Sequence, residues 1–357
     1  MKGYLKLATG ECFEGEWAGN VHEASGEVVF YTGMTGYQEV ISDPSFKGQI
    51  VVFTYPLVGN YGINGFDFES FNPQVSGVVL FETDERGDHW LAHTSFIHTL
   101  NQAGIPVLSE VDTRKVVQQI RKFGDIPGVL TSNPKEAMID YDSLYETHWV
   151  NRVAGKEIQT IGDGYPHIAL IDFGYKKSIS DLLLHLGCKV TVVPYGTGFA
   201  NITKLQPDGI LLSNGPGNPK KLKGYFTIIK KLALTFPTLG ICLGHQLLAL
   251  AFGGDTEKLK FGHRGANQPV KDLLTGRVGM TAQNHSYVVK QSTLQMTDFE
   301  VRFLNINDKS VEGMVHQSKP ILSVQFHPEG HPGPADFKDI FTDFVAVVKE
   351  GRVYAKA

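Results

Sequence analysis

Short apolar runs alternate with helical stretches from His167 onward, and this alternation limits the folds open to the second half of the chain. Parallel neighbouring strands need a crossover connection, usually a helix, so the pattern predicts a parallel, doubly wound α/β sheet. Ligands bind at the carboxyl ends of the strands in such sheets. The expected strands are HIALIDF, KVTVVPY, GILL (leading into the loop SNGPG) and PTLGI, and the expected helices cover 178–186, 225–234 and 245–252.

The first 150 residues have a different composition, which is rich in glycine, aromatic and β-branched residues. The runs GEVVFYT, GQIVVFTYP and VSGVVLFE are typical of short strands bounded by turn residues. One helix is expected over Thr113–Phe123, with Asp112 as its N-cap and Gly124 as its C-cap. This half is predicted to be a mostly β, mixed domain.

Between the two halves, residues 151–166 read NRVAGKEIQTIGDGYP, with three glycines and no clear period. We interpret this segment as a linker between a domain at 1–150 and a domain at 167–357. A chain of 357 residues is long enough for two domains with separate cores.

The segment Gly240-Ile241-Cys242-Leu243-Gly244 lies between an expected strand and an expected helix. Its pattern matches the nucleophile elbow that hydrolases build around serine, in which small flanking residues permit a sharp turn. The thiol would then stand at the start of the helix, where the helix dipole and free N–H groups favour thiolate. A free cysteine is also often a small packed hydrophobe, and the elbow taken alone leaves that alternative open.

A cysteine nucleophile needs a base, and His327 in the segment SVQFHPEG is the best candidate among the thirteen histidines. It follows the apolar strand ILSVQF, and Glu329 two residues later can hold one imidazole nitrogen in the orienting role of a triad acid. Taken alone, His-Pro-Glu is also typical of a surface turn. We expect His245, one turn after Cys242, to be structural, and we expect no metal at His331.

The other two cysteines, Cys12 and Cys188, have no comparable setting, and we expect both to be packed. Three cysteines are too few for a disulfide framework or a cysteine-based zinc site. The net charge is −4 and no basic stripe is present, so we expect no nucleic-acid partner. The start of the chain lacks a signal-peptide core, and no run approaches the roughly 20 apolar residues that cross a bilayer, so a cytoplasmic protein is expected.

Three segments, LSNGPGNP, GICLGHQ and QFHPEG, in this order and spacing, resemble the catalytic segments of class I glutamine amidotransferases. Segments in the first half restrict the resemblance to one kind of amidotransferase subunit. MTGYQEVISDPSFKGQIVVFTYPLVGNYG and EVDTRKVVQQIR are similar to the amino-terminal domain of the small subunits of carbamoyl-phosphate synthase, and KFGHRGANQPV and TAQNHSYVV resemble later segments of the same subunits. The resemblance covers about Gly3 to Phe344.

The resemblance implies a set of roles at matching positions. Cys242 matches the nucleophile, His327 and Glu329 complete the triad, and Gly215 and Leu243 match main-chain donors to the oxyanion. Ser45, in the segment DPSF, matches a contact reaching across from the first domain. The remaining positions that match contacts to glutamine are Gly217, Gln246, Asn284, Ser286 and Tyr287.

Two positions depart from the common family pattern. Ser286 and Ala266 each stand where many relatives have glycine. Family contacts around Ser286 are largely main-chain, so we expect the site to survive, and we expect Ala266 to alter loop geometry rather than chemistry.

The implied chemistry is hydrolysis of the glutamine side-chain amide through a γ-glutamyl thioester, with ammonia as the product that is passed on. The chain has no G-x-x-x-x-G-K-[ST] loop, so no cofactor is expected on it, and ATP and Mg²⁺ are expected on a large subunit that makes carbamoyl phosphate for arginine or pyrimidine synthesis, or both. The first domain would dock on that subunit, in a heterodimer or a higher assembly. Candidate interface aromatics, which are equally consistent with a core, are Phe53, Tyr55, Tyr61, Phe66 and Phe68.

Three other functions compete with this interpretation. The first is an amidotransferase subunit for another acceptor, such as chorismate or a purine nucleotide, against which the segments GYQE, DPSF and DTRK argue. The second is a stand-alone hydrolase of γ-glutamyl peptides. The third is a non-catalytic assembly subunit, which predicts a broken triad, whereas Cys242, His327 and Glu329 are all present.

Overall fold

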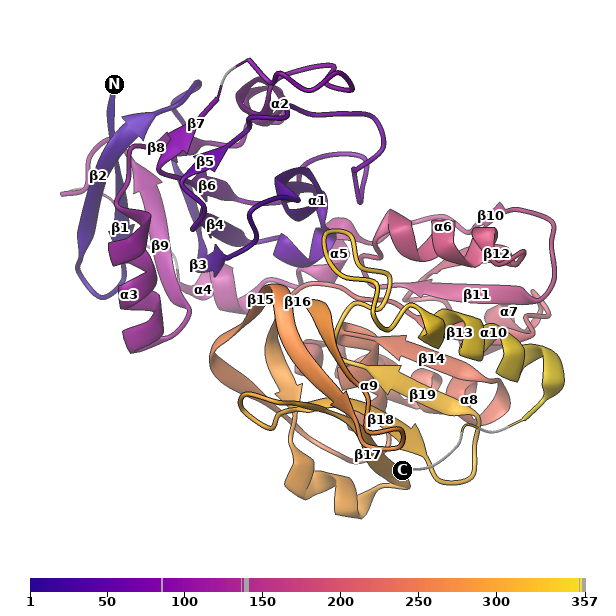
Figure 1. Ribbon diagram of the computed structural model, residues 1–357. Helices are drawn as coiled ribbons and strands as arrows, with labels where there is room; N and C mark the ends of the chain where they lie inside the picture. Colours follow the sequence, from indigo (N-terminus) through magenta and orange to yellow (C-terminus); the bar gives the residue numbers. More distant parts are fainter. Residues whose placement is uncertain (85, 136, 138–140, 353, 355–357) are drawn as a thin grey trace. The chain divides into compact units, whose positions relative to one another are not determined.

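The computed structural model describes the whole chain except residues 85, 136, 138–140, 353 and 355–357 (Figure 1). The described chain divides into two compact units. The first unit is Met1–Trp149 with Lys260–Gly265, and the second is Val150–Leu259 with Ala266–Ala357. None of the described helices combines the length and the apolar character that crossing a membrane requires.

The first unit is built on a closed barrel of strands in the order β1-β2-β8-β6-β4-β3-β9. Side chains of β3 and β4 alternate between two apolar clusters: Ile50 packs with residues of helix α3, and Val51 packs with residues of α1 and α2. This period-2 alternation, with both faces covered, explains the near-continuous apolar runs of the first half. The strands are β1 (Lys2–Leu7), β2 (Cys12–Trp17), β3 (Ala24–Tyr31), β4 (Gln49–Phe53), β5 (Leu57–Val58), β6 (Gly77–Val79), β7 (Glu82–Thr83), β8 (Val107–Ser109) and β9 (Ile126–Thr131), and the helices are α1 (Tyr37–Ser42), η1 (Pro44–Phe46), α2 (Phe96–Gln102), α3 (Thr113–Phe123) and α4 (Tyr141–Glu146).

Helix α3 begins and ends at the expected residues. The side chain of Asp112 accepts a hydrogen bond from the Lys115 N–H at 3.0 Å, and the Gly124 N–H caps the other end on the Ile120 carbonyl. Val116 and Ile120, at helical spacing, are fully buried. Local capping chemistry therefore set both boundaries.

The segment Lys260–Gly265 lies in the middle of strand β15, yet it groups with the first unit. Phe261 packs against the apolar cluster that contains α3. Arg264 forms an ion pair with Asp125 at 3.1 Å, and both side chains are almost fully buried. The predicted division at residue 150 did not include this excursion, because nothing in the local sequence of the segment signals it.

The second unit contains a ten-stranded sheet in the order β10-β12-β11-β13-β14-β19-β18-β16-β15-β17. The strands β12, β11, β13, β14 and β19 are mutually parallel, which confirms the predicted doubly wound α/β fold. The antiparallel strands at both edges of this core were not predicted. The strands are β10 (Gln159–Ile161), β11 (His167–Asp172), β12 (Lys189–Pro194), β13 (Gly209–Leu212), β14 (Thr238–Ile241), β15 (Thr256–Asp272), β16 (Val278–Val289), β17 (Phe299–Asn305), β18 (Val311–His316) and β19 (Ile321–Val324).

Helices cover both faces of this sheet. On β11, Leu170 packs with residues of α6 and α10, whereas Ile171 packs with residues of α7, α8 and α9. The helices are α5 (Val150–Val153), α6 (Lys177–His185), α7 (Phe199–Thr203), η2 (Pro219–Tyr225), α8 (Phe226–Thr235), α9 (Leu243–Ala251), η3 (Gln291–Met296) and α10 (Asp339–Glu350).

The segment 151–166 is not a free linker. It falls within the second unit and contains most of α5 and all of β10. Strand β10 pairs antiparallel with β12 through partners such as Thr160 and Thr191. The interpretation as a linker missed this edge strand because its side chains are exposed and so carry no apolar period.

Candidate active site

Cys242 stands at the turn between β14 and α9, with φ 51° and ψ −100°. Positive φ is unusual for a residue with a side chain and marks local strain that the surroundings must maintain. The Cys242 N–H donates to the carbonyl of Val324 on β19 at 2.8 Å, which fixes the turn to the neighbouring strand. This geometry is that of the predicted elbow.

The two glycines of the elbow are required by close packing. A Cβ atom on Gly244 would lie 2.2 Å from the carbonyl oxygen of Leu212, and one on Gly240 would lie 2.9 Å from the backbone of Gly244. Both approaches are shorter than any side chain tolerates, so the pattern Gly-x-Cys-x-Gly is what allows α9 to start this close to β13.

The thiol is buried among polar groups. Its Sγ lies 3.7 Å from the Asn284 carbonyl oxygen, and the side-chain Nε2 of Gln325 donates to Sγ at 3.6 Å. Gln325 also accepts from Nε2 of Gln246 at 3.0 Å. Sequence reasoning missed Gln325, although a glutamine in the otherwise apolar run ILSVQF was a signal.

His327 and Glu329 form the predicted pair. Nδ1 of His327 lies 2.6 Å from Oε1 of Glu329, and both side chains are buried. Burial alone would lower the pKa of His327, but the carboxylate of Glu329 and the neighbouring Cys242 raise it to about 10. The other ring nitrogen, Nε2, is buried without a hydrogen-bond partner among the described residues. The imidazole is therefore held in its charged form with one nitrogen available to a reacting group.

A buried lysine, Lys176, adjoins the His327–Glu329 pair, and it was not among the residues predicted from sequence. Nζ of Lys176 donates to Oε1 of Glu329 at 3.1 Å, to the Gly330 carbonyl at 2.8 Å, and to the His331 carbonyl. Burial would raise the pKa of Glu329, but Lys176 and then His327 lower it to about 2. The carboxylate therefore stays ionised while it orients the imidazole.

The two expected oxyanion donors lie on different elements. Leu243 is the first residue of α9, directly after Cys242. Gly215 follows β13, and a Cβ atom there would lie 2.2 Å from the Phe173 carbonyl oxygen. Gly217, two residues later, has φ 90°, a conformation that favours glycine.

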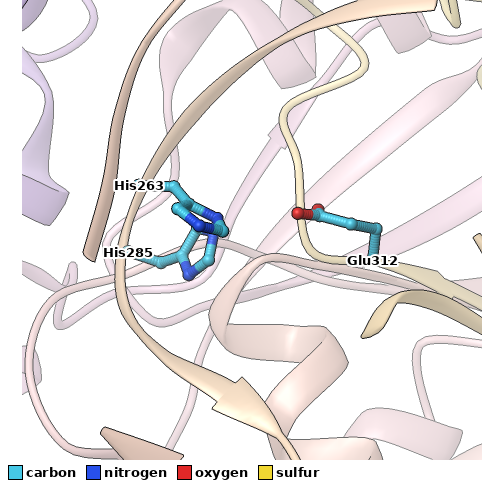
Figure 2. A group of neighbouring side chains, drawn as sticks. All are labelled: His263, His285 and Glu312. Atoms are coloured by element: carbon cyan, nitrogen blue, oxygen red, sulfur yellow. The ribbon is translucent and has the colours of Figure 1, made fainter. Parts of the chain in front are cut away.

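The expected contacts Asn284, Ser286 and Tyr287 lie together near the end of β16. His285, between them, lies 2.9 Å from the Tyr287 carbonyl through Nδ1 and 2.8 Å from the Gln283 side chain through Nε2. Its ring therefore fixes the backbone that carries these residues. Figure 2 shows His285 and Glu312 of β18, both buried in the second unit.

The side chain of Asn284 is buried, and neither its Oδ1 nor its Nδ2 has a hydrogen-bond partner among the described residues. A buried carboxamide without partners is costly, so this group is suited to meet a polar ligand. Gln246, by contrast, is already held, because its Nε2 donates to the Tyr287 carbonyl at 2.8 Å.

Ser45 belongs to the first unit, where it lies in the short helix η1. Its N–H donates to Oδ1 of Asp43 at 2.8 Å, and the residue is buried.

The remaining histidine and cysteine predictions have mixed outcomes. His245 is fully buried, lies 2.9 Å from the Ser323 hydroxyl, and has a pKa lowered by burial to about 3, which confirms a structural role. Cys188 is buried, as expected. The prediction that Cys12 is packed was wrong: it lies at the start of β2 and is exposed, because its strand position faces solvent.

The interface aromatics proposed from sequence also divide. Phe53 lies in the apolar core of the first unit, and Tyr61 and Phe68 pack against that core. Tyr55 and Phe66 are exposed, Phe66 at 71%. Only these two therefore keep the surface position that an interface residue needs.

Comparison with known proteins agrees with this geometry. Residues 169–347 match the family Glutamine amidotransferase class-I, and residues 5–130 match Carbamoyl-phosphate synthase small chain, CPSase domain. A protein of Halalkalibacterium halodurans named carbamoyl phosphate synthase arginine-specific small chain is 54% identical over 354 residues, covering 99% of each chain. Proteins of Geobacillus stearothermophilus and Bacillus subtilis with the same name are each 53% identical and cover 99% of this chain, with 100% and 98% of their own lengths matched.

Identity above one half over nearly the full length covers both units and the elbow, the His327–Glu329 pair and the loops around them. The chain therefore belongs to the carbamoyl-phosphate synthase small-chain family, and its second unit carries a class I glutamine amidotransferase domain.

Proposed function

We propose that this chain is the glutaminase subunit of a carbamoyl-phosphate synthase, with Cys242, His327 and Glu329 as its catalytic triad. The observation that carries the proposal is the buried His327–Glu329 pair, 2.6 Å apart, beside a strained cysteine elbow. A nucleophile, a base and an orienting acid in this arrangement suit acyl transfer.

In the proposed reaction, the Cys242 thiolate attacks the side-chain carboxamide carbon of glutamine. The N–H groups of Gly215 and Leu243 stabilise the oxyanion, and each such donor is worth about 10²–10³ in rate. The tetrahedral intermediate collapses by breaking the C–N bond, and the His327 imidazolium gives its proton to the departing nitrogen, so ammonia leaves. Water, deprotonated by His327, then attacks the γ-glutamyl thioester, which releases glutamate and the thiolate.

Glutamine recognition is assigned to residues around the elbow. The buried carboxamide of Asn284, without partners among the described residues, suits a polar group of the substrate. The other proposed contacts of the second unit are Gly217, Gln246, Ser286 and Tyr287, and Ser45 of the first unit is proposed as a further contact.

The ammonia is proposed to pass to a large subunit that holds ATP and Mg²⁺, in a heterodimer or a higher assembly in the cytoplasm. The first unit is the proposed docking surface for that subunit, and the exposed side chains of Phe66, Phe71 and Trp90 are candidates for it. The names of the relatives from H. halodurans, G. stearothermophilus and B. subtilis favour a role in arginine synthesis.

Cys242→Ala tests the proposal. The wild-type chain, combined with its large subunit, should support carbamoyl phosphate formation from either glutamine or ammonia. The variant should lose the glutamine-dependent reaction and keep the ammonia-dependent one. Glutamine hydrolysis that persists in Cys242→Ala would contradict the assignment of the nucleophile, and glutaminase activity that the large subunit neither changes nor uses would favour a stand-alone hydrolase.

A further inference from the structure

Two loops at the carboxyl edge of the parallel sheet, those after β11 and β13, are joined by the side chain of Asn214, which lies just after β13 and is fully buried. Its Oδ1 accepts from the main-chain N–H of Lys176 at 3.1 Å, and its Nδ2 donates to the Gly174 carbonyl at 3.1 Å. An N–H group can only donate and a carbonyl can only accept, so these two partners fix the orientation of the carboxamide.

Further bonds make the loop after β11 rigid. The Ser213 hydroxyl accepts from the Phe173 N–H at 2.9 Å and donates to the Asn214 carbonyl at 2.8 Å. Oδ1 of Asp172 accepts from the N–H groups of Gly174 and Tyr175 at 2.7 and 3.0 Å. Asn214 adds the bond that reaches the peptide of Lys176 itself.

This bond matters because of where the lysine side chain goes. Nζ of Lys176 binds Glu329 and the carbonyls of Gly330 and His331, which ties the loop after β11 to the loop after β19. Displacement of a supporting group by about 1 Å can cost about 10²-fold in rate. A residue that fixes the main chain of Lys176 therefore also fixes the position of its ammonium group, which binds the Glu329 carboxylate.

On its other side, Asn214 is bonded through its own peptide to Gly215, the proposed oxyanion donor. Gly215 packs so closely against Phe173 that its position follows that of the loop after β11. Asn214 thus connects the Lys176–Glu329 ion pair with the proposed oxyanion donor Gly215.

We propose that Asn214 is a positioning residue for glutamine hydrolysis, which sets Glu329 through Lys176 and sets Gly215 through the adjoining peptide. The inference rests on the proposed glutaminase function. Asn214 does not touch the reacting atoms in this scheme, and its effect passes through the groups that do.

A purely structural role makes a different prediction. A variant that only destabilises the fold lowers the active fraction but leaves the pKa values of Glu329 and His327 unchanged in the molecules that stay folded. Loss of positioning instead moves Lys176 away from Glu329 and His327. The pKa of Glu329 then rises, because its buried carboxylate loses the cation, and the pKa of His327 rises as well, because Lys176 lowers it in the wild type.

The test uses Asn214→Ala and Asn214→Asp in the full chain with its large subunit. Asn214→Asp keeps the acceptor for the Lys176 N–H but replaces the donor to Gly174 by a second oxygen. We expect kcat for glutamine hydrolysis to fall by about 10–100-fold in both, with KM within about threefold, and the acid limb of the pH profile to move to higher pH. Thr191→Val is the matched control, because the buried Thr191 hydroxyl also serves two side chains, those of His167 and Thr160, on a strand away from the site.

An unchanged pH profile in both Asn214 variants, or a loss equal to that of Thr191→Val, would overturn the proposal. A second measurement does not depend on catalysis. The His327 ring, titrated by NMR, should show a raised pKa in Asn214→Ala and no change in Thr191→Val, and an unchanged His327 titration in Asn214→Ala overturns the positioning role. Failure of the wild type to hydrolyse glutamine would instead contradict the proposed function. The NMR titration would then test the link from Asn214 to His327 by itself.

Discussion

Oε1 of Glu329 is shared by two buried cations: Nδ1 of His327 lies 2.6 Å away and Nζ of Lys176 lies 3.1 Å away. The carboxylate therefore orients the imidazole while the lysine keeps the carboxylate ionised. A triad acid in a buried site needs such support, because desolvation alone favours its neutral form.

His327→Asn should lower glutamine hydrolysis by at least about 10³-fold, because both the proton donor to ammonia and the base for water are lost. Glutamate release from glutamine measures the effect. The fold should persist, since asparagine fits the space of the ring. His167→Asn is the control, because His167 lies at the start of β11 and bonds Thr191 of the neighbouring β12, and it should keep wild-type activity. Equal losses in the two variants would show that general damage, and not catalysis, explains the first.

Glu329→Gln should lower the free energy of unfolding of the second unit in a pH-dependent way. The pKa of folded His327 is raised above 6.5 to about 10, so its contribution is complete below 6.5 and is lost as pH rises toward 10. The pKa of folded Glu329 is lowered below 4.5, so its contribution is complete above 4.5 and is lost as pH falls. The difference in free energy of unfolding between wild type and variant should be largest, about 3–5 kcal/mol, between pH 4.5 and pH 6.5, where both contributions are complete. Chemical unfolding followed by circular dichroism measures it, and a difference that grows toward pH 10 would contradict the assignment.

Lys176→Met leaves the buried carboxylate of Glu329 without its cation. The pKa of folded Glu329 should rise, and the variant should be about 3–5 kcal/mol less stable at neutral pH. Because the wild type loses its own stabilisation as pH falls below 4.5, the difference should shrink on acidification. Catalytic efficiency should fall by about 10–100-fold as the loop 329–331 loses its anchor. Lys177→Met, whose lysine forms an exposed pair with Asp181, is the control and should change neither quantity.

Features set by neighbours in sequence were predictable. Both ends of α3 follow from Asp112 and Gly124, and the elbow follows from two glycines that flank Cys242. The pairing of His327 with Glu329 was predictable because these two residues stand two positions apart after an apolar strand. In each case the physical constraint acts within a few residues, so the sequence displays it.

Features set by distant partners were not predictable. Lys176 acquires its role from Glu329, which is 153 residues away, and Asn214 reaches Lys176 across 38 residues. Only the folded sheet brings these loops to one edge. The same holds for the segment 260–265, whose partner Asp125 is 139 residues from Arg264.

Gly215→Ala should lower kcat for glutamine hydrolysis by about 10²–10³-fold, the loss expected when one oxyanion donor is displaced. The new Cβ would lie 2.2 Å from the Phe173 carbonyl, so the loop must shift. Gly224→Ala is the matched control, because a Cβ there meets nothing within 4 Å. Steady-state kinetics of both variants checks the prediction, and wild-type kcat in Gly215→Ala would exclude this N–H from catalysis.

Asp125→Ala should destabilise the first unit by about 3–5 kcal/mol, because it leaves the guanidinium of Arg264 buried without its carboxylate. The double variant Asp125→Leu with Arg264→Met should recover most of this loss, since a well-packed apolar pair avoids the desolvation of both charges. All three tryptophans, Trp17, Trp90 and Trp149, lie in the first unit, so urea unfolding followed by tryptophan fluorescence reports this unit alone. If the double variant is as unstable as Asp125→Ala, the prediction is contradicted. The attraction between the two charges, and not the cost of leaving Arg264 without its carboxylate, would then explain the loss.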